Sequence, residues 1–140
     1  MAKQAEILII DGQGGGMGRA LTERLRAASP EAEIVAVGTN VLATAAMLKA
    51  GASAGATGEN AVRVNCRRAD VIAGPIGIVL ADALLGEITP EMARCVAASP
   101  ARKVLLPMQK CHIQVAGVAP LTTQELVEDA VRRILEGQKQ

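Results

Sequence analysis

Short apolar runs separated by glycine-rich and polar turns recur along the chain, and they predict a regular series of buried strands. Five runs have the length and the apolar character of strands, at residues 7–10, 34–37, 52–57, 70–73 and 103–107. We expect Gly74-Pro75 to end the fourth of them. A last strand is expected at residues 112–118, where Ile113 and Val115 alternate onto one face.

Helical periodicity fills the intervals between these runs. Met17, Leu21 and Leu25 recur every four residues, so an amphipathic helix is predicted to begin near Met17 and to end at Ser29-Pro30. Further helices are expected at the remaining periodic segments, which are residues 41–50, 61–68 and 90–98, and the segment after the capping box formed by Thr122 and Glu125.

Residues 76–85 are apolar on nearly every side. A helix of that kind must be covered all round. Because one small domain rarely covers a helix so completely, we expect this segment to contribute to a subunit interface and the protein to be a homo-oligomer.

The alternation of strands and helices predicts an α/β fold. We expect a single domain over residues 1–140, a three-layer Rossmann-like open sheet that is mostly parallel, with about five or six strands and helices on both faces. A chain of 140 residues is long enough to bury a core of this size.

The amino-acid composition argues against two classes of binding partner, nucleic acids and membranes. The chain has no Phe, Tyr or Trp and a net charge of +1, which argues against nucleic-acid binding because stacking platforms and a basic field are both missing. The longest uncharged apolar stretch, residues 71–81, is too short to cross a bilayer, and no signal-peptide pattern opens the sequence. We therefore expect a soluble, cytoplasmic protein without a membrane partner.

Three cysteines, Cys66, Cys95 and Cys111, are widely spaced and odd in number. They are expected to stay reduced, and their spacing matches no zinc motif, so no metal site is predicted.

The segment Asp11-Gly12-Gln13-Gly14-Gly15-Gly16-Met17-Gly18, called the glycine loop below, lies between the first predicted strand and the first predicted helix. Glycines there let backbone N–H groups approach an anion at the positive end of a helix. The loop predicts phosphate or nucleotide binding. The alternative is a glycine-rich turn that serves tight packing of the helix on the strand.

The spacing Gly12-x-x-x-Gly16-x-Gly18 resembles the fingerprint of the short-chain dehydrogenases/reductases, and Gly14-x-Gly16-Met17-Gly18 resembles the loops of other Rossmann oxidoreductases. The resemblance implies NAD or NADP, with the dinucleotide pyrophosphate at the helix N-terminus. The chain departs from the first family because it contains no tyrosine for the Tyr-x-x-x-Lys pair. It also has Gly38-Thr39-Asn40 where NAD-binding domains usually have an acid that binds the ribose.

Asp11 is a further departure from these families, since its carboxylate would repel a neighbouring pyrophosphate. Asp11 is tolerable if it accepts backbone N–H groups of the turn, pairs with Arg19, or helps to hold magnesium. We favour the first of these explanations.

Other candidates lie at the predicted strand ends, where open α/β sheets bind ligands. Thr39 and Asn40 are expected to bind a ribose or a 2′-phosphate near Arg19, or to cap the following helix. Gly58, Glu59, Asn60, Gly74 and Pro75 are expected to line the same crevice, or to serve as turn and cap residues. His112 is next to Cys111, but neighbours in a strand point to opposite faces, which disfavours a Cys-His catalytic pair.

Four strings span most of the chain: Asp11-Gly12-Gln13-Gly14-Gly15-Gly16, Gly38-Thr39-Asn40, Ala56-Thr57-Gly58-Glu59-Asn60 and Gly86-Glu87-Ile88-Thr89. With them the chain resembles an uncharacterised bacterial family of short single-domain proteins, known only as a domain of unknown function. The resemblance implies a Rossmann-like fold and no established activity.

Three hypotheses follow. The first is a nucleotide-binding module for NAD(P) or a related nucleotide, with a sensing or regulatory role. The second is a small NAD(P)-dependent reductase whose site is completed by a neighbouring subunit. The third is a structural or interaction protein with a vestigial glycine loop. The sequence identifies no catalytic residue.

Overall fold

The computed structural model describes residues 4–108 and 112–137, and its centre is a sheet of five parallel strands. The strands are β1 (Glu6–Asp11), β2 (Glu33–Gly38), β3 (Ala54–Thr57), β4 (Val71–Pro75) and β5 (Arg102–Leu106). They lie in the order β3-β2-β1-β4-β5. In this register Ile7 of β1 pairs with Ile34 of β2 on one side and with Val71 of β4 on the other.

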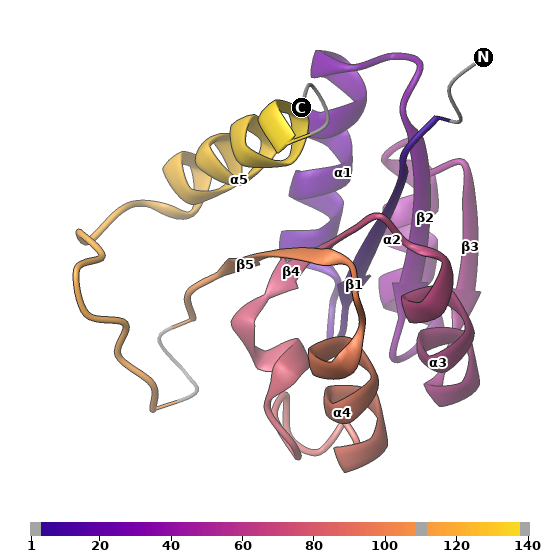
Figure 1. Ribbon diagram of the computed structural model, residues 1–140, viewed down its shortest axis with the longest axis vertical. Helices are drawn as coiled ribbons and strands as arrows, with labels where there is room; N and C mark the ends of the chain where they lie inside the picture. The colour runs from indigo at the N-terminus through magenta and orange to yellow at the C-terminus, as the bar shows by residue number, and fades with distance from the viewer. Residues whose placement is uncertain (1–3, 109–111, 138–140) are drawn as a thin grey trace.

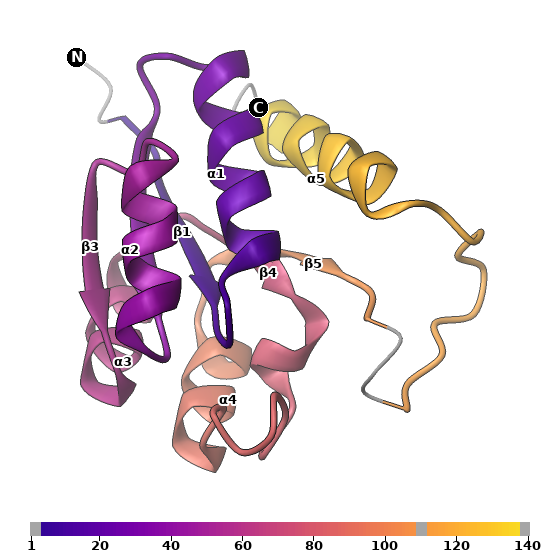
Figure 2. The ribbon, with the colours of Figure 1, turned by 180° about the vertical axis from the view of Figure 1, so that it is seen from behind.

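Helices cover both faces of the sheet (Figures 1 and 2). One layer holds α1 (Gly16–Ala28), α2 (Val41–Lys49) and α5 (Thr123–Gly137), and α1 contacts both of the others. The opposite layer holds α3 (Glu59–Arg68) and α4 (Pro90–Ala98), which contact one another. The three-layer α/β arrangement predicted from the sequence is therefore confirmed.

Strand β1 lies at the centre and contributes to both halves of the core. Ile7 and Ile9 pack with side chains from α1, α2 and α5, whereas Leu8 and Ile10 pack with side chains from α3 and α4. All four side chains are almost completely buried. This alternation of an apolar strand between two helical layers is expected of a parallel sheet, and it fixes the position at which β1 delivers the glycine loop.

Two predicted elements and one predicted strand end are wrong. Residues 76–85 do not form one helix: a short 3₁₀-helix, η1 (Ile76–Val79), is followed by turns in which Asp82, Leu84 and Leu85 have positive φ. Residues 112–118 contain a bend and a turn and pair with no strand in the described part of the chain, and Ile113 is 39% exposed. Strand β4 runs on through Gly74 to Pro75.

The capping box before α5 is confirmed. The backbone N–H of Thr122 donates to Glu125 Oε1 at 3.0 Å, and the backbone N–H of Glu125 donates to Thr122 Oγ1 at 3.1 Å. The Thr122 backbone N–H contributes most to holding the pKa of the Glu125 carboxyl below its usual value, and the Thr122 side chain contributes next.

The chain order creates a switch point beside β1. From β1 the chain builds β2 and β3 on one side and then returns to the other side to build β4 and β5. Because all the strands are parallel, their carboxyl ends share one edge of the sheet. In open α/β sheets ligands bind at that edge, where the strand order reverses.

Candidate functional site

The glycine loop lies at the switch point and turns sharply into α1. Its turn is closed by the Gly15 N–H, which donates to the Gly12 carbonyl at 2.9 Å. Gly15 has a φ of +73°, a conformation that glycine adopts without strain, and α1 begins at the next residue. The loop therefore directs the N-terminus of α1 toward the carboxyl edge of the sheet.

The carboxylate of Asp11 stabilises this turn through two hydrogen bonds. Its Oδ1 accepts from the Gly12 N–H at 2.8 Å and its Oδ2 accepts from the Gly18 N–H at 2.6 Å. Burial raises the pKa of the Asp11 carboxyl, although the two backbone hydrogen bonds oppose that rise. This is the first of the three explanations given for Asp11.

The other two explanations for Asp11 find no support. Arg19 lies 3.8 Å from Glu23 in an exposed ion pair on α1. Within the described ranges no cluster of three or more His, Cys, Asp or Glu side chains is arranged to hold a metal ion.

The glycines of the loop fall into two groups when a Cβ is placed on each. A Cβ on Gly12 comes 2.6 Å from Thr39 Oγ1, one on Gly15 comes 2.8 Å from the Ala43 Cα, and one on Gly18 comes 2.8 Å from the Asp11 Cβ. Packing therefore requires these three. A Cβ on Gly14 or Gly16 meets no atom within 4 Å, and neither residue has a positive φ.

The open glycines border a small cavity at the helix N-terminus. It measures about 160 Å³ and is lined by residues 11–17 together with Pro75, Leu84 and Met108. A larger cleft of about 560 Å³ shares Gln13, Leu84 and Met108 with it, and is also lined by His112, Ile113 and residues 80–85. Ligand sites of proteins commonly have a volume of this order.

Thr39 and Asn40 reach the glycine loop from the end of β2. Asn40 caps α2 through Oδ1, which accepts from the Ala43 N–H at 2.9 Å, and its Nδ2 donates to the Gln13 carbonyl at 2.9 Å. The capping role considered for this residue is therefore present, and Asn40 also ties the glycine loop to α2.

Glu87, on the segment between η1 and α4, contacts Gln13 of the glycine loop without lining either of the two cavities, and sequence reasoning did not single it out. Its Oε1 accepts from the Gln13 N–H at 2.8 Å, from Thr39 Oγ1 at 2.6 Å and from Asn40 Nδ2 at 2.9 Å. The Thr39 hydroxyl contributes most to holding the pKa of Glu87 below its usual value. The string that contains Glu87 carried the family resemblance, but nothing in its local spacing predicted a contact with residues so far back in the chain.

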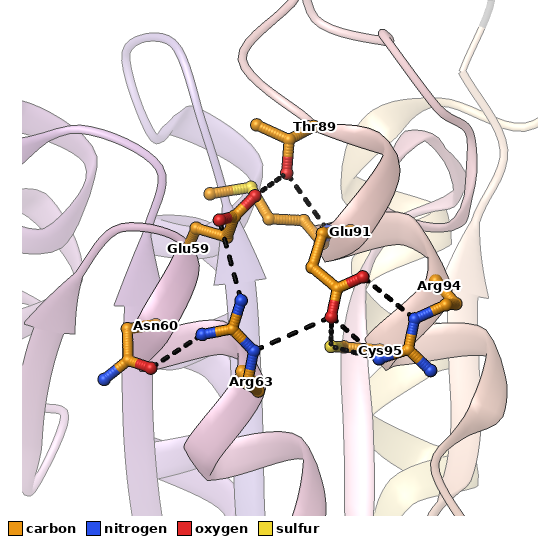
Figure 3. A network of polar contacts seen from close by, with 8 residues as sticks. Glu59, Asn60, Arg63, Thr89, Glu91, Arg94 and Cys95 are labelled. Atoms are coloured by element: carbon orange, nitrogen blue, oxygen red, sulfur yellow. Dashed lines mark hydrogen bonds and ion pairs between the residues drawn. The ribbon is translucent and has the colours of Figure 1, made fainter.

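Glu59 and Asn60 belong to a separate network between α3 and α4 (Figure 3). Glu59 Oε1 accepts from Thr89 Oγ1 at 2.6 Å, and Asn60 Oδ1 accepts from the Arg63 guanidinium at 2.7 Å. The Arg63 Nε also lies 3.6 Å from Glu91. The side chains of Glu59 and Asn60 are engaged at this interface, and neither lines the cavities at the glycine loop.

The glycines at the two other strand ends have structural explanations. A Cβ on Gly74 would come 2.3 Å from the Ile10 carbonyl oxygen, so this glycine permits close packing of β4 on β1. Gly58 has a φ of +104°, which favours glycine, and is the N-cap residue of α3. Pro75, in contrast, lines the small cavity.

His112 lines the larger cleft, as does Gln13 of the glycine loop. It has a φ of +55° and does not lie in the strand expected at residues 112–118. Cys111 lies outside the described residues. None of the helices in residues 4–108 and 112–137 has the length and apolar character needed to span a membrane.

The chain belongs to the family described as a domain of unknown function, DUF3842, whose model matches residues 6–139. This confirms the family resemblance drawn from the four sequence strings. No curated protein matches the chain.

Solved structures that are similar in fold include the following two. A dodecameric FMN-dependent UbiX-like decarboxylase from Escherichia coli O157:H7 aligns over 96% of this chain and 95% of its own, at 19% identity and a TM-score of 0.54. The crystal structure of AibC aligns over 97% of this chain, at 19% identity and a TM-score of 0.52. This chain spans 40% of the length of AibC. Both likenesses support an open α/β fold of the Rossmann or flavodoxin type.

Proposed function

We propose that this member of the DUF3842 family binds a small nucleotide, with a phosphate seated on the backbone N–H groups at the N-terminus of α1. One observation carries the proposal: Gly14 and Gly16 lack side chains at positions where neither packing nor backbone conformation requires glycine. Their bare backbone faces a cavity of about 160 Å³, which suits a phosphate group. A helix N-terminus adds a partial positive charge at that point.

The adjoining cleft suits the remainder of such a ligand. Leu80, Leu84 and Ile113 give it apolar walls, and Gln13 lies at its junction with the phosphate position. A flat ring packed between aliphatic side chains would be held there by burial of its apolar surface.

Two nucleotide classes are supported by different observations. The strand order and the loop at the switch point are those of dinucleotide-binding domains, which supports NAD or NADP. The FMN dependence of the similarly folded decarboxylase supports a flavin mononucleotide. In both cases we assign the phosphate to the same backbone groups.

The proposed role is sensing or regulation by the bound nucleotide. A small reductase is the alternative, and His112 favours it because this titratable side chain lines the cleft. The short-chain dehydrogenase mechanism does not apply, because the chain has no tyrosine.

We further propose that the working form is a homo-oligomer. Leu85 is 96% exposed at the edge of the cleft, and Val115, Val118 and Leu121 are each more than two-fifths exposed on the segment that leads to α5. Grooves of about 760 and 930 Å³ lie along that segment. A second copy would bury this apolar surface, and the similarly folded decarboxylase is dodecameric. Sedimentation velocity that finds only monomer at micromolar concentration would overturn this proposal.

Calorimetric titration of the protein with NAD⁺, NADP⁺ and FMN tests nucleotide binding. We expect saturable binding of at least one of them, and a loss of affinity of about tenfold or more in a Gly14→Ala/Gly16→Ala variant, because two methyl groups would occupy the phosphate position. Absence of binding to all three, or equal binding by the variant, would overturn the proposed function.

A further inference from the structure

An acidic side chain, that of Glu87, lies at the end of β2 although it comes from a distant part of the chain. Dinucleotide-binding domains usually carry an acid at this strand end that binds the ribose hydroxyls, and here the sequence has Gly38-Thr39-Asn40. In the structure the carboxylate of Glu87 lies against Thr39 and Asn40. An acidic group is therefore present at the position where the local sequence lacks one.

The two carboxylate oxygens of Glu87 are used differently. Oε1 accepts all three hydrogen bonds, from the Gln13 N–H, the Thr39 hydroxyl and the Asn40 amide. Within the described part of the chain, Oε2 accepts no hydrogen bond and forms no ion pair. Glu87 is half-buried, and its Oε2 is not among the fully buried side-chain oxygens that lack a hydrogen-bond partner in the described residues.

The backbone around Glu87 is also fixed. The Glu87 N–H donates to the Leu84 carbonyl at 3.1 Å, and the Asp82 N–H donates to the Ile88 carbonyl at 2.7 Å. The Ile88 side chain is 1% exposed and anchors the turn in the core. The carboxylate is thus held on a closed turn before any ligand arrives, which reduces the entropy lost on binding.

We propose that Glu87 binds the ribose of the nucleotide through Oε2, so that the site accepts nucleotides with free ribose hydroxyls and rejects those with a 2′-phosphate. This inference rests on the proposed nucleotide binding and names its ligand more closely. An ionised carboxylate is an acceptor only, so it pairs with hydroxyl groups. A 2′-phosphate at the same position would face a like charge.

The charges around this position agree with that selectivity. The hydrogen bonds from Thr39, Gln13 and Asn40 keep the pKa of Glu87 low, so the carboxylate is ionised at neutral pH. Asp11 is a second acid close by, and the charge of Glu87 contributes to the raised pKa of Asp11. Arg19, which sequence reasoning offered as a partner for a 2′-phosphate, is paired with Glu23 instead.

The variant Glu87→Gln tests the role of the free oxygen. Glutamine has the same shape, and its amide oxygen is able to accept the three anchoring hydrogen bonds, while its NH₂ group replaces Oε2 with a donor. A matched control is Glu33→Gln, which removes one negative charge from an exposed residue at the opposite end of β2. Calorimetry with NAD⁺, NADP⁺ and FMN measures all three proteins.

We expect the wild type and Glu33→Gln to bind NAD⁺ about tenfold or more tightly than NADP⁺, and Glu87→Gln to lose that preference through weaker NAD⁺ and stronger NADP⁺ binding. A purely structural role for Glu87 lowers both affinities and leaves their ratio unchanged, which would overturn the inference. Equal wild-type affinities for NAD⁺ and NADP⁺, or binding of FMN alone, would also overturn it while the proposed nucleotide binding stands. If the wild type binds none of the three, the proposed function fails, and this inference fails with it.

Discussion

Alanine substitutions at Gly16 and Gly18 test which glycine is required for ligand binding and which is required for packing. A Cβ at Gly18 would come 2.8 Å from the Asp11 Cβ and 2.6 Å from the Met47 sulfur. Overpacking of this kind costs about 1–3 kcal/mol, against a gain of up to about 1 kcal/mol from the helix propensity of alanine. We expect Gly18→Ala to lower the free energy of unfolding by about 1–2 kcal/mol.

Gly16→Ala is expected to behave in the opposite way. Its Cβ meets no atom within 4 Å, so the substitution leaves stability unchanged or raises it by up to about 1 kcal/mol. The new methyl group lies where we place the phosphate, so nucleotide affinity is expected to fall about tenfold, equivalent to about 1.4 kcal/mol.

Urea unfolding measures the stability of both variants, and calorimetry with NAD⁺ and FMN measures their affinity. The reasoning is refuted if Gly16→Ala is destabilised as much as Gly18→Ala, because packing would then explain both glycines. It is equally refuted if Gly16→Ala binds nucleotide as the wild type does.

Asp11→Asn is expected to lower the free energy of unfolding by about 1–3 kcal/mol, because an amide has one acceptor oxygen for the two backbone N–H groups that Asp11 binds. An unchanged midpoint of urea unfolding would contradict this prediction. Burial raises the pKa of the Cys66 thiol to about 11, so a thiol-specific dye should label Cys66 slowly at neutral pH in a Cys95→Ser/Cys111→Ser variant. Rapid stoichiometric labelling of that variant without denaturant would count against it. Thr122→Ala should lower the free energy of unfolding by about 1 kcal/mol, because it removes the acceptor for the Glu125 N–H. Thermal unfolding measures this effect, and a Tm equal to that of the wild type would contradict it.

Most of the fold was predictable because it depends on local signals. Buried strands such as β1 are short continuous apolar runs, and the helix ends carry recognisable caps, as at Thr89, whose hydroxyl accepts from the Met92 N–H at 3.1 Å. These signals identified the five strands of the sheet and the five α-helices, with boundaries that differ by a few residues from those observed.

The two wrong elements show where local signals fail. The apolar segment at residues 76–85 predicts a helix, but a short 3₁₀-helix places Ile78 in the core and turns with positive φ then lead to the buried Ile88. The alternation at Ile113 and Val115 resembled a strand, yet a strand also needs a neighbour with which to form hydrogen bonds, and the segment has none in the described sheet.

The candidate site was predictable only in part. The glycine loop and its position before α1 followed from sequence, as did the position of Thr39 and Asn40 at the end of β2. Ligand binding by these residues stays a prediction. The contact of these residues with Glu87 did not, because it joins positions 47 or more residues apart and depends on the path of the turns after η1. The side chain of Asn60 accepts from Arg63, one helical turn away, and Asn60 lines neither cavity at the glycine loop.

The central claim is that a nucleotide phosphate binds the backbone N–H groups at residues 14–17, and ¹⁵N–¹H correlation spectra recorded during a titration with NAD⁺ or FMN test it most directly. We predict that the amide resonances of Gly14, Gly16 and Met17 shift most, and that they shift in proportion to saturation. Saturable binding that moves the resonances of α5 and leaves the glycine loop unchanged would contradict the claim, as would spectra that do not respond to either nucleotide.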